Sequence, residues 1–96
     1  MDKIVYLINL YDYYGSLLTV KQQNYFEDYY FKNLTLSEIS ENRYVSRNAI
    51  HKTLKEVEEK LYNFEKILKL YSKSQKIKEL IKDLDKDLKE KIEELL

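Results

Sequence analysis

The chain has 96 residues, and its 17 basic and 17 acidic side chains give a formal net charge of zero. One domain fits this length, and the lack of proline, the single glycine and the many Lys, Glu and Leu residues predict an all-α fold. The absence of cysteine excludes disulfides and thiolate zinc sites. No apolar run reaches the roughly 20 residues of a membrane span, so we expect a cytoplasmic protein without membrane insertion.

Two helices are expected in the first third of the chain. The first is predicted over residues 3–17, where apolar side chains recur at helical spacing. Thr19 is a suitable N-cap for a second helix over residues 20–32, and Gln22 stands three residues later, as a capping box requires.

The next two helices are predicted to form a helix-turn-helix. Thr35 and Glu38 have the spacing of a second capping box, which starts a short helix over residues 36–42. Ser46 is a preferred N-cap for the fourth helix. Only residues 42–45 remain between them, a length that suits the steep turn of this motif.

The fourth helix carries a heptad-like apolar seam, which predicts that it extends well beyond the head and packs along a partner helix. Beyond Ile50, the seam consists of Leu54, Val57, Leu61, Phe64, Leu68 and Tyr71. We therefore divide the chain into residues 1–71, with the helix-turn-helix and the long helix, and residues 72–96, a C-terminal amphipathic helix. The seam is covered by that last helix, as an antiparallel hairpin, by a second copy, or by both, and we predict a homodimer.

The candidate binding residues lie at the start of the fourth helix, the part of a helix-turn-helix that meets the ligand. They are Ser46, Arg47, Asn48, His51, Lys52 and Lys55. Arginine can contact guanine and asparagine can contact adenine, whereas lysine suits phosphate. The alternative is that this basic face is ordinary solvated surface, because the chain lacks the basic excess of a typical DNA-binding domain.

Catalysis and cofactor binding are not expected. The chain has one histidine, no cysteine and no glycine-rich phosphate loop, so no nucleophilic or phosphate-transfer motif can be assembled. His51 has no acidic residue three or four positions away and is therefore interpreted as a surface or ligand-facing side chain rather than a metal ligand. The sequence thus predicts a binding protein.

Four segments also resemble a known family. They read YLINLYDYYGSLLT, LTVKQQNYFEDYY, LTLSEIS and VSRNAIHKTLKEVEEKL, and they occur in this order within the region of similarity, residues 4–64. They resemble the YlxM family, small bacterial proteins whose helix-turn-helix is similar to region four of sigma factors. The resemblance implies a non-catalytic accessory of the signal recognition particle, with the Ffh GTPase or the particle's RNA as partner. The alternative, supported by the helix-turn-helix itself, is a sequence-specific DNA-binding regulator.

The predicted turn departs from the sigma-like pattern at two positions. Tyr44 occupies the place where a glycine usually supports a left-handed conformation, and a bulky residue is disfavoured there. Arg43 stands where an apolar residue is customary, whereas Ser40 keeps the usual small residue. Either the turn is built differently, or Tyr44 tolerates the strain.

Overall fold

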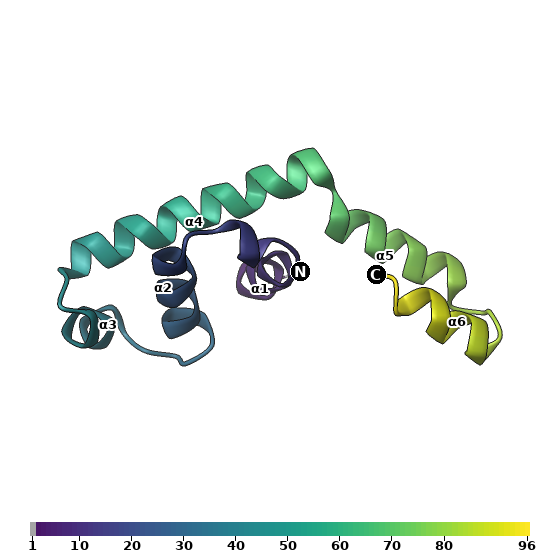
Figure 1. Ribbon diagram of the computed structural model, residues 1–96, viewed down its shortest axis with the longest axis horizontal. Coiled ribbons are helices and arrows are strands. Elements are labelled where there is room, and N and C mark those ends of the chain that lie inside the picture. The colour runs from purple at the N-terminus through teal and green to yellow at the C-terminus, as the bar shows by residue number, and fades with distance from the viewer. Residues whose placement is uncertain (1) are drawn as a thin grey trace.

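A computed structural model describes residues 2–96, which fold entirely into helices and connecting turns (Figure 1). The helices are α1 (Lys3–Tyr14), a short 3-10 helix η1 (Gly15–Leu17), α2 (Val20–Tyr30), α3 (Leu36–Arg43), α4 (Arg47–Leu68), α5 (Leu70–Ile81) and α6 (Lys86–Glu93). This arrangement confirms the predicted all-α class and the helix-turn-helix head. None of the helices in the described part of the chain is both long and apolar enough to cross a membrane.

The head consists of α1, α2 and α3 packed on the same side of α4 (Figure 1). Leu7 and Leu10 of α1 lie with Phe26 of α2 and Leu61 of α4 in one core cluster. A second, smaller cluster joins α2, α3 and the start of α4. The helix-turn-helix is therefore fixed to the rest of the head by apolar contacts.

Both predicted capping boxes are present. The Thr19 hydroxyl accepts the backbone N–H of Gln22 at 3.1 Å, and the Gln22 side chain accepts the N–H of Thr19 at 3.0 Å. Thr35 and Glu38 make the same reciprocal pair, with both distances at 3.1 Å. These local hydrogen bonds satisfy N–H groups that have no partner within the helix, and so set where α2 and α3 begin.

The apolar seam of α4 is covered by the chain's own head. Val57 and Leu61 are fully buried, and they pack in the core cluster that α1 and α2 supply. Leu68 stays 42% exposed, at the end of α4 where the head no longer reaches. The structure thus corrects the hairpin interpretation, because α5 leads away from α4 instead of folding back along it (Figure 1).

The junction between α4 and α5 is fixed by a buried carboxylate. Lys69 adopts a left-handed conformation with φ 56° and ends α4. Glu65 accepts the N–H of Tyr71 at 3.1 Å and that of Ser72 at 3.0 Å, which satisfies the first turn of α5. The Tyr14 hydroxyl donates to Glu65 at 2.6 Å and accepts the N–H of Leu70 at 3.0 Å. A side chain from α1 therefore holds the angle between α4 and α5.

The C-terminal segment forms two helices where a single amphipathic helix over residues 72–96 was predicted. The break comes after Ile81, and the Asp85 side chain then accepts the N–H of Leu88 at 3.3 Å as the N-cap of α6. The chain reverses in the turn between α5 and α6, and α6 runs back so that Leu96 lines the same hollow as Tyr71 (Figure 1).

The two C-terminal helices make the molecule elongated. Its Cα radius of gyration is 16.4 Å, and its principal extents are 52 × 25 × 23 Å. A compact domain of this length would have a radius near 12.5 Å. We call residues 70–96, which contain α5 and α6, the arm, because they extend beyond the head formed by α1 to α4.

Candidate functional site

The turn of the helix-turn-helix is built with Tyr44 in the left-handed region. Tyr44 has φ 56° and ψ 41°, and its N–H donates to the carbonyl of Ser40. The Ser40 hydroxyl in turn donates to the carbonyl of Val45. The tyrosine side chain is 94% exposed, so it contributes little packing to offset the strain of this conformation. The turn therefore keeps the usual geometry without the usual glycine.

Arg43, the second departure from the family pattern, ties α3 to α2. Its guanidinium donates to both carboxylate oxygens of Asp28, at 2.9 and 3.2 Å. Lys32 also lies 3.3 Å from this carboxylate. The hydrogen bond from Arg43 holds the pKa of Asp28 below its usual value, although burial acts against it. This ion pair fixes the first helix of the motif on the head.

The six predicted binding residues are all exposed at the start of α4. Ser46 caps the helix, because its hydroxyl accepts the N–H of Ala49 at 3.0 Å. Ser46, Arg47, Asn48 and His51 also line one shallow hollow together with Leu36. The structure therefore brings four of the six residues around one space.

Helical spacing separates the five candidate residues that follow Ser46 into two stripes along α4. Arg47, His51 and Lys55 follow one another at intervals of four and share a face of α4. Asn48 and Lys52 occupy the neighbouring stripe, although Asn48 still reaches the hollow that Arg47 and His51 line. Lys55 lines a hollow with His51, whereas Lys52 lines none of those found around α4.

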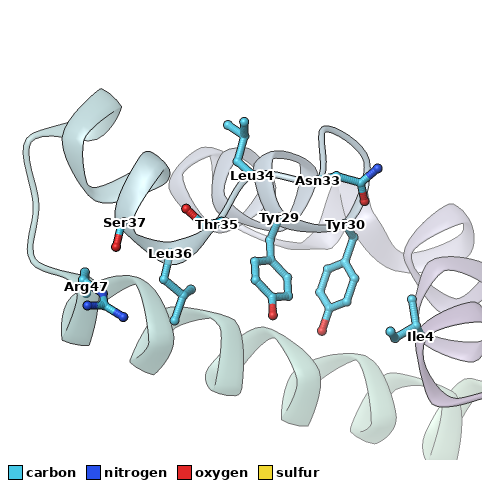
Figure 2. A pocket seen from close by; sticks show the side chains of 9 residues that line it. All are labelled: Ile4, Tyr29, Tyr30, Asn33, Leu34, Thr35, Leu36, Ser37 and Arg47. Atoms are coloured by element: carbon cyan, nitrogen blue, oxygen red, sulfur yellow. The ribbon is translucent and has the colours of Figure 1, made fainter.

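The stripe that begins at Arg47 faces a groove between α2 and α4, which we call the tyrosine groove (Figure 2). Tyr29 and Tyr30 project from the end of α2 toward α4, and Leu36 lies between them and Arg47 (Figure 2). The larger hollow has a volume of about 470 Å³ and extends from Arg47 past Tyr29 and Tyr30 to Ile4 (Figure 2). A smaller hollow, lined by His51 and Lys55, shares the same two tyrosines. The groove thus joins the start of α4 to the aromatic end of α2.

The tyrosine groove carries a positive charge although the whole chain is neutral. Glu58 is the one acidic residue that lines it within residues 2–96, and Lys3 pairs with this carboxylate at 2.8 Å. Neither Arg47 nor Lys55 forms an ion pair with a described acidic residue. Two cationic groups therefore remain free to meet an anionic ligand.

The groove includes residues that the sequence did not single out as functional. Together with Tyr25 and Phe26, Tyr29 and Tyr30 have the helical spacing of an apolar face, so the sequence favours a packing role for both tyrosines. Only the packing of α2 against α4 reveals that Tyr29 stays 38% exposed. Within residues 2–96, no three His, Cys, Asp or Glu side chains gather as a metal site would require.

The comparison with known families agrees with this geometry. The family model of the UPF0122 proteins, helix-turn-helix proteins that are YlxM / p13 like, matches residues 1–96. The match confirms the family resemblance that the segments of the first four helices indicated. It covers the arm as well as the head.

Individual relatives come from several bacteria. A UPF0122 protein of Desulforamulus reducens is 54% identical over 71 residues, which cover 73% of this chain and 61% of the relative, less than two thirds of its length. A UPF0122 protein of Fusobacterium nucleatum is 39% identical, with 100% of this chain and 94% of the relative covered. One from Clostridium acetobutylicum is 41% identical, with 98% and 84% covered. The chain therefore belongs to the YlxM / p13-like family of helix-turn-helix proteins.

Proposed function

We propose that the protein is a non-catalytic accessory of the signal recognition particle, which it binds through the first turns of α4. The observation that carries the proposal is the pair of free cations, Arg47 and Lys55, beside an aromatic groove on a chain whose net charge is zero. The YlxM resemblance supplies the partner, with either Ffh or the particle's RNA as the surface that is touched.

The charge distribution favours such a partner over a scanned duplex. A protein that binds duplex DNA through many phosphates needs many cations, and its affinity then falls steeply with salt. Here the net charge is zero, and the exposed cations at the start of α4, Arg47, Lys52 and Lys55, form only a small local patch. A small basic surface suits one defined site on an RNA or an acidic protein surface better than repeated contacts along a duplex.

Charge reversal tests the proposal. We expect replacement of Arg47, Lys52 and Lys55 by glutamate to abolish binding to the reconstituted particle in a fluorescence anisotropy titration. The matched control replaces Lys66, Lys73 and Lys76, three exposed lysines outside this surface, by glutamate and changes the net charge equally. Equal losses in both triple variants would mean that only the overall charge matters, and the proposed site would be abandoned.

A second candidate function is a sequence-specific DNA-binding regulator. It is favoured by the turn itself, because Tyr44 keeps the left-handed geometry and the side chains of Arg47 and Asn48 stay exposed at the start of α4. On a cognate duplex, Arg47→Ala should then cost about 1–3 kcal/mol and relax the base preference at one position. Binding that is equal for all duplexes would count against this candidate.

We further propose that the arm mediates homodimerisation. Several of its large apolar side chains are exposed, and burying them against a second copy would remove this apolar surface from water. They are Leu70 (44%), Leu80 (81%), Leu84 (41%), Leu88 (48%) and Leu95 (85%). Light scattering should give twice the chain mass of 11.7 kDa at micromolar concentration.

Substitutions can separate the contribution of the arm to dimerisation from that of the head. Leu80→Ser with Leu88→Ser should produce a monomer, because these substitutions remove exposed apolar surface from α5 and α6. Val20→Ser serves as the control, since Val20 is 72% exposed on the head. A monomeric mass for the unmodified chain would reject the dimer.

A further inference from the structure

We propose that the tyrosine groove binds unpaired nucleotides of an RNA, with Tyr29 stacked on a base and with Arg47 and Lys55 against the phosphates. The proposal rests on the function proposed above and deepens it, because it states which part of an RNA the protein recognises. It also assigns a binding role to α2, which lies outside the helix-turn-helix.

The aromatic part of the groove is held in place before any ligand arrives. The Tyr29 ring meets the Tyr30 ring edge to face, with centroids 5.0 Å apart and planes at 86°. Tyr30 is itself half-buried, and both rings point from α2 toward α4 (Figure 2). Tyr29 keeps 38% of its surface exposed within this frame. A fixed and exposed ring is the platform on which an unpaired base stacks, whatever its identity.

The charged part of the groove is arranged along one line. Arg47, His51 and Lys55 are spaced by four residues, so their side chains follow the groove over about 12 Å of helix axis. The carboxylate of Glu58 is already neutralised by Lys3 at 2.8 Å. A strand whose bases face Tyr29 can therefore place its phosphates against Arg47 and Lys55 without meeting a free acid.

The shape and chemistry of the groove favour unpaired RNA over a duplex. Bases inside a duplex are stacked on one another and cannot stack on a side chain, and the deep groove of an RNA duplex is too narrow for side chains to read. Asn33 and Ser37, both exposed, add an amide and a hydroxyl to the lining. Such groups can hydrogen bond to the 2′-hydroxyl that distinguishes RNA from DNA.

The test is an anisotropy titration of the full chain with a fluorescein-labelled ten-nucleotide oligouridine. The same RNA annealed to its complement and a DNA strand of equal length provide the comparison ligands. Tyr29→Ala should weaken binding of the single-stranded RNA by about fivefold or more, whereas Tyr29→Phe should retain it because the ring is kept. Tyr44→Ala is the matched control, since Tyr44 is a 94% exposed tyrosine outside the groove.

A charge variant keeps the proposal testable even if Tyr29→Ala fails to fold. Lys55→Glu should weaken binding at least as strongly as Tyr29→Ala, and Lys66→Glu should have a much smaller effect. Stronger binding to the duplex or to DNA would overturn the proposal, as would equal effects of Tyr29→Ala and Tyr44→Ala.

The two proposals fail in different ways. Loss of binding to the particle in the charge-reversed triple variant, together with unchanged particle and oligouridine binding in Tyr29→Ala, would leave the accessory role intact and reject the groove. Groove-dependent binding of oligouridine without any binding to the particle would retain the groove and reject the accessory role.

Discussion

Tyr44 stands in a backbone conformation that suits glycine, and its exposed ring gives little packing in return. Relieving the left-handed strain should outweigh the entropy that glycine adds to the unfolded chain, so Tyr44→Gly should raise the free energy of unfolding by about 0.5–1 kcal/mol. Urea denaturation measures this change. Tyr44→Ala should give no such gain, because alanine also carries a Cβ atom. A loss of stability in the glycine variant would mean that the tyrosine ring makes a contact of its own.

Arg43 and Asp28 form the most buried ion pair of the head, with the Asp28 side chain only 4% exposed. Arg43→Ala should lower the free energy of unfolding by about 1–2 kcal/mol, less than for a fully buried pair because the Arg43 side chain is 34% exposed. Lys32→Ala removes the outer cation, and it should cost less than about 0.5 kcal/mol.

The same pair predicts a dependence on pH. Because the pKa of Asp28 is lowered in the folded state, its contribution is complete above the ordinary value of 3.8 and is lost as the pH falls through the lower folded pKa. The difference between the unmodified protein and Arg43→Ala should therefore shrink below about pH 4. A difference that stays constant down to pH 2 would contradict this assignment.

At the scale of the elements, the junction of α4 and α5 depends on Tyr14 and Glu65. Burial, together with the hydrogen bond to Glu65, raises the pKa of Tyr14 to about 12, so the hydroxyl keeps its proton at neutral pH. Tyr14→Phe removes the group that donates to Glu65 and accepts from Leu70, and it should lower the free energy of unfolding by about 1–2 kcal/mol. Tyr44→Phe, at an exposed site, should leave stability unchanged in the same urea experiment.

The sequence predicted the elements whose signals are local. Thr19, Thr35 and Ser46 lie at the helix starts that their side chains indicated, because each cap is closed by a residue three positions away. The end of α4 was predicted too late, near Tyr71, because the seam continues beyond the actual break at Lys69. That break depends on the hydrogen bond between Tyr14 and Glu65, which lie 51 residues apart in the sequence. Periodicity cannot reveal a contact of this kind.

The sequence alone could not predict which elements cover the seam of α4, or that tyrosines of α2 form part of the candidate site. A heptad pattern shows that Val57 and Leu61 are covered, but both a partner helix and the chain's own α1 and α2 satisfy it. The exposed basic residues of α4 could be predicted from the helix-turn-helix alone. Tyr29 could not, because its exposure depends on how α2 packs against α4.

At the scale of the whole molecule, the elongated and net-neutral chain places the cations of the candidate site and the exposed leucines on different parts. The free cations of the candidate site lie on the head, and many of the exposed leucines lie on the arm.

Two phosphate contacts, from Arg47 and Lys55, predict that the logarithm of the affinity for single-stranded RNA falls with the logarithm of salt concentration with a slope of about −1.4. Anisotropy titrations at several salt concentrations give this slope. A value near −6 would require many more phosphate contacts than the groove offers.

A competition titration decides whether the surface from Arg47 to Lys55 binds the signal recognition particle. The labelled protein is titrated with reconstituted particle, with and without its RNA, in the presence of excess random duplex DNA. We predict saturable binding that the duplex does not displace and that is lost when the RNA is omitted. Absence of binding to the particle, together with steeply salt-dependent binding to the duplex, would contradict the account and would favour a DNA-binding regulator.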